Sequence, residues 1–215
     1  MPPKPKFNRE EIVSAGLDIA RESGIEAVKA REVGEKLGCS SRPIFTFFES
    51  MEELQKAVEL KAWSIFNSYI EIADSYVPSF KKRGMQMIKF AQEEPKLFQL
   101  LFMTEKAPID FENLMKTRIS GFGRDIDTIC SSYGVAKDEA NKLFGNMWVS
   151  AYGICVLCAT KVCAFTEAEL AEMLGQFFAG MVMLIKSGRK NEFDFKPTLK
   201  ETPESRKHSV PFTEV

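Results

Sequence analysis

Cysteine and histidine are the residue types in this chain that most readily support catalysis or metal binding. Cys155 and Cys158 have the Cys-x-x-Cys spacing of zinc ligands and redox-active thiols. They lie in an apolar stretch without a second cysteine pair, and the single histidine, His208, lies in the polar C-terminal segment. Two buried thiols are therefore favoured over a zinc or redox site. The sequence predicts no metal, no cofactor and no catalytic residue, and the chain is not expected to be an enzyme.

A second set of side chains has the types that contact nucleic acid. Ser41, Arg42 and Thr46 lie within a segment of eleven residues between Gly38 and Phe48. Hydroxyl and guanidinium groups donate hydrogen bonds to phosphates and to base edges. Recognition by these residues requires a helix that presents them on one exposed side.

Two short helices joined by a tight turn are expected to position them. Val33 and Leu37 lie four residues apart, as on one helix face, and Gly38 can adopt the left-handed conformation that ends a helix. Ser40 is a strong N-cap candidate, so the second helix is expected to start at Ser41. This order is that of a helix-turn-helix, whose second helix can enter a DNA major groove.

Proline and apolar residues support the same arrangement of the second helix. Pro43 falls in its expected first turn, where backbone N–H groups have no partner within the helix. Ile44, Phe47 and Phe48 give the helix a side that can be buried.

The remaining pattern predicts an all-α protein, because no strand pattern occurs along the chain. Asn8 with Glu11, and Ser50 with Glu53, form candidate capping boxes, the second at the start of a helix that runs to about residue 76. Prolines then separate further segments of helical pattern. Helices are expected near residues 80–93, 95–103, 110–132, 137–162 and 166–187.

Composition limits the classes of protein that fit. The 215 residues carry a net charge of -1, and the first fifty hold equal numbers of basic and acidic residues, so no basic patch is predicted. No signal peptide and no apolar run of about 18 residues is recognised, so no membrane is expected. Five cysteines form no disulfide framework, and this odd number suits the reducing cytoplasm.

Several features of the first 58 residues occur together in one known family. These are the run Arg31–Gly34, the turn Leu37–Ser40, the aromatic residues Phe45 and Phe48, and the helix start at residues 50–54. With its flanks, the segment from residue 7 to about 58 resembles the N-terminal domain of TetR/AcrR-type transcriptional regulators. The resemblance implies a repressor that binds double-stranded operator DNA as a homodimer and changes its DNA binding when a small molecule binds.

The resemblance assigns the DNA contacts to the helix-turn-helix and its borders. The expected DNA-binding residues are Lys29, Arg31, Ser40, Ser41, Arg42, Pro43, Phe45, Thr46, Phe47 and Met51. Three of them depart from the family pattern: Phe45 replaces a frequent Tyr, Phe47 a frequent His, and Met51 a frequent Lys. Two phosphate contacts would be lost with them. This keeps an alternative open, a dimeric ligand-binding or interaction module of the same fold without DNA affinity.

The last two predicted helices carry apolar faces wider than one helix pair needs. The run from Met147 to Ile154 is similar to a pattern in the C-terminal domains of the same family, which implies a four-helix interface between two copies. The expected interface residues are Met147, Ile154, Leu174, Phe178, Met181, Val182 and Ile185.

Large adaptable side chains are concentrated in the helices that surround a ligand cavity in the family. The candidate ligand-binding residues are Met87, Phe90, Phe98, Phe102, Phe122, Trp148 and Tyr152. The alternative is that they are ordinary core residues, which the closure of a helical bundle also requires. The expected ligand is an apolar or amphipathic small molecule.

These observations divide the chain into three parts. Residues 1–50 form the expected helix-turn-helix DNA-binding domain, and residues 51–188 the helical domain for ligand binding and dimerisation. Residues 189–215 are polar and contain three prolines, so they are expected to form an extended or disordered tail.

Overall fold

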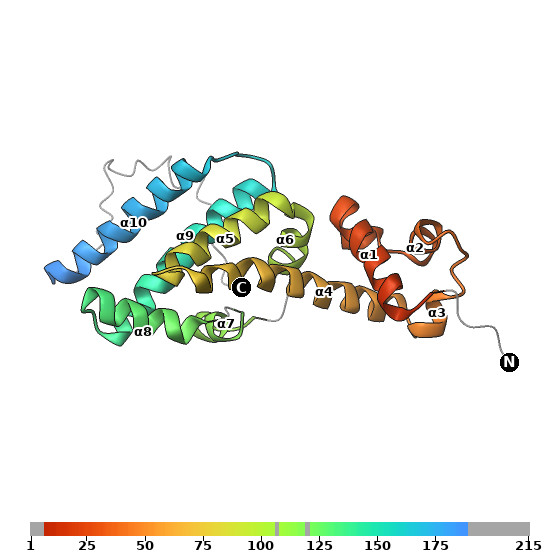
Figure 1. Ribbon diagram of the computed structural model, residues 1–215, viewed down its shortest axis with the longest axis horizontal. Coiled ribbons are helices and arrows are strands. Elements are labelled where there is room, and N and C mark those ends of the chain that lie inside the picture. Colours follow the sequence, from red (N-terminus) through yellow and green to blue (C-terminus); the bar gives the residue numbers. More distant parts are fainter. Residues whose placement is uncertain (1–6, 106–107, 119–120, 189–215) are drawn as a thin grey trace, which may run out of the picture.

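The computed structural model describes residues 7–105, 108–118 and 121–188, and within them the chain is all-α without strands (Figure 1). The expected fold class is confirmed, whereas the predicted tail at 189–215 lies outside the described residues. The helices are α1 (Arg9–Ser23), α2 (Ala30–Lys36), α3 (Ile44–Phe47), α4 (Met51–Glu71), α5 (Ser79–Glu93), α6 (Pro95–Phe102), α7 (Phe111–Arg118), α8 (Phe122–Tyr133), α9 (Lys137–Ala159) and α10 (Glu167–Ser187), with 3₁₀ segments η1 (Ile25–Ala27) and η2 (Ile72–Ser75).

The helices form an elongated molecule in which α4 joins the two ends (Figure 1). At one end α1 packs on α4 and on α2, and α3 lies beside the start of α4, while α1 also contacts α6. At the other end α5 packs along α9, with α8 and α10 beside α9. The α4 helix therefore belongs to both ends.

Local capping explains where the two longest N-terminal elements begin. The Asn8 side chain accepts a hydrogen bond from the Glu11 N–H at 2.9 Å, and Glu11 accepts from the Asn8 N–H at 2.8 Å, which confirms the first capping box. The second is only half formed. Ser50 accepts from the Glu53 N–H, whereas the Glu53 carboxylate accepts from the N–H of Glu49.

The expected single helix over residues 110–132 is wrong, because the chain forms two helices, α7 and α8. Gly121 lies between them with a φ of +79°, a left-handed conformation that favours glycine. A Cβ atom at this position would lie 2.7 Å from Nη2 of Arg83. The glycine thus lets the guanidinium of α5 reach the start of α8.

One apolar core runs from the N-terminal helices into the bundle. It joins Ile12 of α1, Phe66 of α4, Phe90 of α5 and Cys155 of α9, and a second core lies under α8 around Ile129. A bidentate ion pair adds a polar contact between the ends, since Arg21 donates from Nε and Nη2 to the Glu94 carboxylate at 3.0 and 2.9 Å. The position of α1 is therefore coupled to the bundle by packing and by charge.

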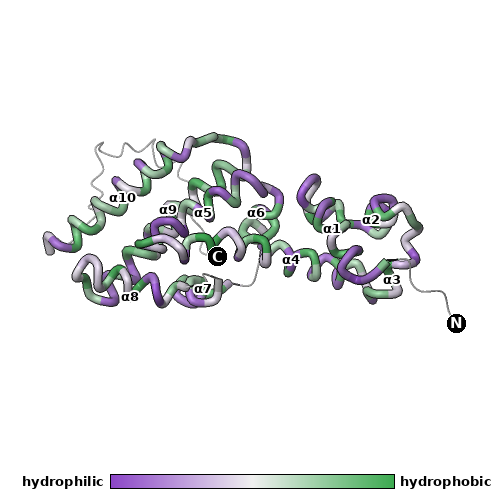
Figure 2. The backbone as a smooth tube through the Cα atoms, in the orientation of Figure 1, coloured by the Kyte–Doolittle hydropathy of each residue, from purple (hydrophilic) through white to green (hydrophobic). Residues whose placement is uncertain are grey.

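The helices α9 and α10 are long and apolar enough, by length and composition, to cross a membrane. The expectation that no apolar segment reaches this length is wrong for them, because alanine raises the mean hydropathy of both helices, cysteine that of α9 and methionine that of α10 (Figure 2). A core helix of a soluble bundle passes the same test, and 44% of the apolar window of α9 is buried. Only 22% of the corresponding window of α10 is buried, so much of its apolar surface lacks cover within the described chain.

Candidate functional site

The turn between α2 and α3 packs directly on α2. Gly38 follows the helix with a φ of +66°, as the sequence predicts, and the Cys39 N–H donates to the Gly34 carbonyl at 2.9 Å. A Cβ atom at Gly34 would lie 2.9 Å from the Cys39 carbonyl oxygen. Glycine at this position is what allows the close approach.

The second helix of the motif is shorter than expected. The structure has a turn over residues 41–43 and the helix α3 only from Ile44 to Phe47, so the predicted start at Ser41 with Ser40 as N-cap is wrong. Pro43 precedes the helix with a φ of −57°. Proline has no N–H to donate in the first turn, and the Ile44 N–H donates to the Ser41 carbonyl three residues back at 3.2 Å, so a tight turn precedes the α-helical hydrogen bonds.

The exposed side of this motif carries the side chains that were expected to contact DNA. Ile44 and Phe48 are buried, whereas Arg42, Thr46 and Phe45 are exposed, Phe45 to 52%. The expected DNA-binding residues are placed as follows: Lys29, Arg31, Ser40, Arg42, Phe45 and Thr46 are exposed, and Ser41, Pro43, Phe47 and Met51 are half-buried.

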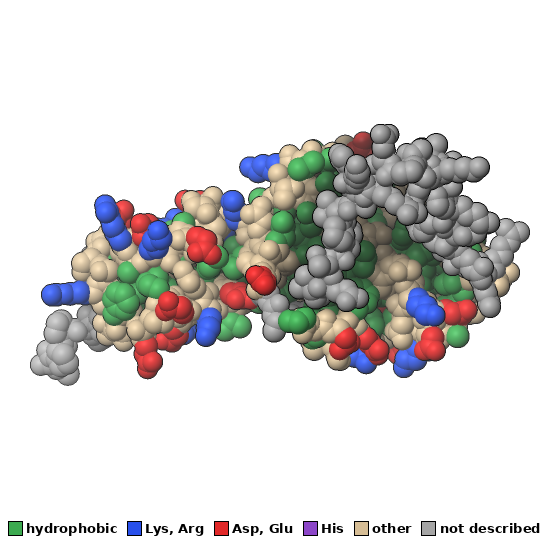
Figure 3. All heavy atoms as spheres, turned by 180° about the vertical axis from the view of Figure 1, so that it is seen from behind, with side chains coloured by type: hydrophobic (Ala, Val, Ile, Leu, Met, Phe, Trp, Pro, Cys, Tyr) green, Lys and Arg blue, Asp and Glu red, His purple; other side chains and the backbone are tan. Residues whose placement is uncertain are grey.

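Acidic neighbours offset the charge of this end of the molecule. Arg31 donates to Glu35 at 2.8 Å, and this hydrogen bond raises the pKa of the guanidinium. Lys36 lies 3.7 Å from Asp18 and 3.4 Å from Glu22. On the face shown in Figure 3, blue and red side chains are interspersed at this end. The electrostatic attraction to a polyanion is correspondingly modest.

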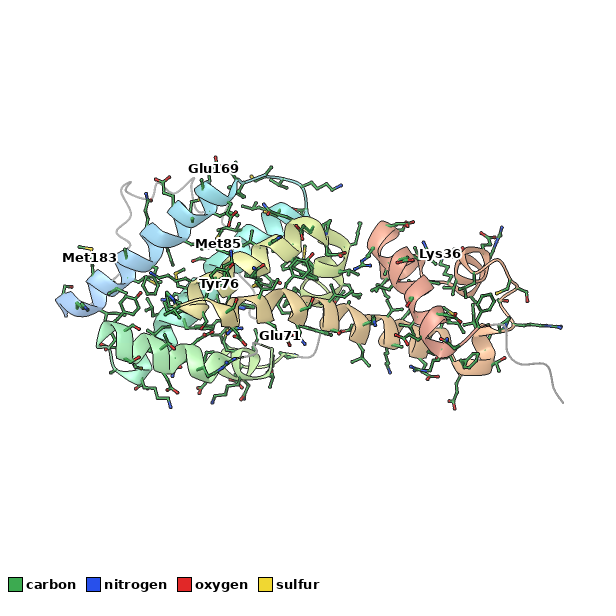
Figure 4. All side chains as sticks on the ribbon, in the orientation of Figure 1. Lys36, Glu71, Tyr76, Met85, Glu169 and Met183 are labelled. Atoms are coloured by element: carbon green, nitrogen blue, oxygen red, sulfur yellow. The ribbon has the colours of Figure 1, made fainter. Side chains whose placement is uncertain are left out.

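A cavity of about 360 Å³ lies among α4, α5, α9 and α10. This volume is at the lower end of the range of small-molecule sites. The apolar part of its lining includes Phe66 and Ile70 of α4, Phe80, Met85 and Met87 of α5, Met147 and Trp148 of α9, and Leu174 and Phe178 of α10. Met85 and Tyr76 are labelled in Figure 4.

The polar lining of the cavity is cationic. Lys81, Lys82 and Arg83 line it, together with Tyr76, and no aspartate or glutamate is among its described lining residues. Nη1 of Arg83 and Nε1 of Trp148 are buried without a hydrogen-bond partner within the described part of the chain, and neither nitrogen has accessible surface. The accessible positive charge of the lining therefore comes from Lys81 and Lys82.

Carboxylates hold the other nitrogens of Arg83. Nε donates to Asp125 at 2.7 Å and Nη2 to Asp74 at 2.9 Å, while Ser79 also donates to Asp125 at 2.8 Å. Hydrogen bonds from Arg124 and then Arg83 lower the pKa of Asp74. The network holds the charged side chain of Arg83 in a buried position, where it is only 5% exposed.

The candidate ligand-binding residues are only partly brought to this cavity. Met87 and Trp148 line it. The other five do not: Phe90 and Phe98 are core residues, Phe102 and Tyr152 pack with them, and Phe122 packs on Phe144.

The cationic lining was missed at the sequence level. Its signal is three consecutive cations, residues 81–83, near the start of α5, where the helix dipole disfavours positive charge.

The two thiols of the Cys-x-x-Cys run are buried in α9. Burial raises the pKa of both Cys155 and Cys158, so at neutral pH they are protonated, and a protonated thiol is a poor nucleophile and metal ligand. Among the described residues, no group of three His, Cys, Asp or Glu side chains is placed to hold a metal ion.

The helix α10 has two different apolar sides. Leu170, Leu174 and Phe178 are buried against the rest of the chain, while Met173, Phe177 and Met183 are exposed. Met183 projects away from the bundle in Figure 4. We call the outer side the α10 outer face, defined by these three exposed residues.

The interface residues expected from the sequence lie mostly toward the inner side. Ile154, Leu174 and Phe178 are buried in the two cores of one chain, which leaves them little surface for a second copy. The other four, Met147, Met181, Val182 and Ile185, pack partly buried against the cores. Most of the apolar surface left for a partner therefore consists of different residues on the same helix.

The chain shares its fold with the crystal structure of a transcriptional regulator from Rhodococcus sp. Rha1. The two have a TM-score of 0.52 and 15% sequence identity over 85% of this chain and 97% of that one. No protein-family model matches the chain, and no curated protein matches it. At this identity the similarity concerns the arrangement of helices.

Proposed function

We propose that this protein is a TetR-type transcriptional regulator that acts in the cytoplasm as a repressor and binds operator DNA as a homodimer. The observation that carries the proposal is the helix-turn-helix, in which Ile44 and Phe48 are buried while Arg42 and Thr46 are exposed. The fold shared with a transcriptional regulator supports it. Residues 1–50 would bind DNA, and residues 51–188 would bind the ligand and the second copy.

Dimerisation through the α10 outer face would complete the DNA-binding unit. Helix-turn-helix dimers read two half-sites about 34 Å apart, one turn of the duplex, so the distance between two recognition helices decides whether both can dock. The outer face lies at the opposite end of the molecule from α3 (Figure 1). Small changes along the helices between them would therefore alter the spacing of the two motifs.

The cavity and α4 provide a route for regulation. Phe66 and Ile70 line the cavity from α4, and the first half of the same helix packs on α1. A ligand that binds better to one position of α4 shifts the population toward that position. In the proposed mechanism, ligand binding changes the angle of the motif relative to the bundle and releases DNA.

A second candidate function is a dimeric ligand-binding or interaction module without DNA affinity. Three observations favour it: α3 has only four residues, Phe45 offers no hydroxyl to a phosphate, and Arg31 is paired with Glu35. Each of them reduces the number of available phosphate contacts.

A titration of the DNA upstream of its own gene separates the two functions. Fluorescence anisotropy is measured for the parent protein and for Arg42→Ala across a range of salt concentrations. A regulator binds one segment selectively with a salt-dependent affinity, and Arg42→Ala weakens that complex by about 1–3 kcal/mol. Lys89→Ala, on the exposed side of α5 far from the motif, serves as control. Equal, weak binding to all sequences would refute the proposed regulator and favour the second candidate.

A further inference from the structure

We propose that the cavity binds an amphipathic carboxylate, with its anionic head at Lys81 and Lys82 and its hydrocarbon body among the aromatic and methionine side chains of α4, α5 and α9. The inference names the ligand class of the proposed regulator and in that sense rests on the proposed function. Its evidence, however, lies within the cavity and does not involve DNA.

The charge of the lining carries the first step. Three consecutive cations line the cavity, and no carboxylate of the described residues lines it with them. They differ in burial, since Lys81 is exposed, Lys82 half-buried and Arg83 buried. Asp125 and Asp74 offset the charge of Arg83, so the positive charge that an entering ligand would meet is that of Lys81 and Lys82.

The partners of these cations leave room for a further negative charge. Arg83 is held by Asp125 and Asp74, and Lys82 lies 3.8 Å from Glu167. Lys81 instead has its Nζ 4.8 Å from the centre of the Phe178 ring, an aromatic partner that leaves its hydrogen-bond donors available. An anion near Lys81 would gain a charge-assisted hydrogen bond.

The sign of the accessible charge favours an anionic head over a cationic one. Lys81 and Lys82 line the cavity, so a carboxylate would be attracted to both, whereas a quaternary ammonium head would be repelled by both.

The remainder of the lining suits a hydrocarbon chain. Its aromatic and methionine side chains include Phe66, Met85, Met87 and Phe144. Methionine is flexible and polarisable, so it adapts to an alkyl chain of variable position. Burial of each methylene group contributes about 0.8 kcal/mol to binding but does not fix the orientation of the ligand. The lysine side chains at the other end of the ligand would fix it.

Three probes of one chain length test the proposal: decanoate, decan-1-ol and decyltrimethylammonium. Binding is measured by calorimetry with the full-length protein in the absence of DNA. Decanoate is expected to bind about tenfold or more tightly than decan-1-ol, the ratio of one charge-assisted hydrogen bond, and decyltrimethylammonium more weakly than either. The proposal would be overturned if decanoate did not bind. It would also be overturned if decan-1-ol or decyltrimethylammonium bound as tightly as decanoate.

Variants locate the head group. Lys81→Met and Lys82→Met keep an apolar stem, and each is expected to lower decanoate affinity about three- to tenfold while leaving decan-1-ol affinity unchanged. Lys89→Met, on the same helix but outside the cavity, should change neither. Equal loss for both probes would refute the assignment of the head. Arg83 is left intact, because its removal would leave Asp125 buried without a counter-charge.

The two tryptophans report where the probe lies. Trp63→Phe leaves Trp148 as the only indole, and decanoate is expected to change its fluorescence with the same midpoint as the calorimetric titration. Binding without this change would place the ligand elsewhere and overturn the proposal. If the protein binds decanoate but no operator, the ligand class stands and the proposed regulator function is refuted. If it binds an operator but no decanoate, only the ligand class is refuted.

Discussion

The helices around α1 and the helix α10 differ in how completely one chain covers their apolar side chains. In α1 the apolar residues Ile12, Leu17 and Ala20 are all buried in a core closed by α4. In α10, by contrast, the apolar residues Phe177 and Met183 are 47% and 72% exposed. The helix α1 is covered on its apolar side within one chain, whereas α10 presents an apolar surface that a second copy could cover.

The two ends also differ in what they bury. The buried charged side chains of the described residues, Arg83 and Asp125, belong to the bundle, while the ion pairs of the N-terminal helices, such as Arg31 with Glu35, lie at the surface. A buried pair depends on accurate geometry, and a surface pair contributes little. The bundle is therefore the end where single polar substitutions have large effects.

The largest effect is expected from Asp125→Ala. Its side chain is fully buried and accepts from Nε of Arg83, so the substitution leaves a cation buried without its nearest partner. We expect a loss of about 3–5 kcal/mol in the free energy of unfolding, measured by chemical denaturation. Asp127→Ala, at an exposed site of the same helix, should stay within about 0.5 kcal/mol. Similar values for the two variants would show that the buried network does not stabilise the bundle.

The next effect concerns the α10 outer face. Met183→Glu places a charge in the proposed interface and should weaken dimerisation by about 2–4 kcal/mol with little change in monomer stability, because an unpaired charge would be buried between two copies. Leu60→Glu on α4 is a matched control, since Leu60 is 71% exposed and Met183 72%. Sedimentation velocity should show a monomer for the first variant and an unchanged dimer for the second. Two unchanged dimers would exclude this face as the interface.

Glycine substitutions test the tight packing of the N-terminal end. Gly34→Ala places a Cβ atom 2.9 Å from the Cys39 carbonyl oxygen, and we expect a loss of about 1–3 kcal/mol in stability. In the bundle, a Cβ atom added at Gly123 of α8 would meet no other atom within 4 Å, so Gly123→Ala should stabilise by up to about 1 kcal/mol. Thermal unfolding measures both. If both variants changed the stability in the same direction, the proposed difference in packing between the two glycines would be contradicted.

The smallest effect on stability, and a gain in DNA binding, is expected from Glu35→Gln. The pair of Glu35 with Arg31 is exposed, so its loss should change stability by less than about 0.5 kcal/mol. Arg31 is then available to a phosphate, and the slope of log affinity against log salt should steepen by about one. Gel-shift titrations at several salt concentrations measure this slope, with Glu112→Gln on α7, an exposed carboxylate in the bundle, as control. An unchanged slope would place Arg31 away from the DNA.

Local rules predicted much of the N-terminal end. Asn8 with Glu11 begins α1, Gly38 ends the first helix of the motif, and the spacing of Val33 and Ile44 places them in the core. These features depend on residues within a few positions of one another, such as a cap and the N–H groups that it satisfies. The start of α3 was predicted three residues too early, because the chain makes a tight turn at Pro43 before the helix begins.

The sequence by itself determined the helical class, most helix positions and the turn that ends α2 at Gly38. Only the tertiary structure decided which side of α10 is covered: Leu174 and Phe178 pack inward and Phe177 outward, although all are apolar. Periodicity selects a face only where polar residues occupy the other one, and α10 is apolar on both sides. The cavity was equally hidden, because a void depends on how helices distant in sequence fit together, so the run of cations at residues 81–83 could not be assigned to a cavity wall from the sequence.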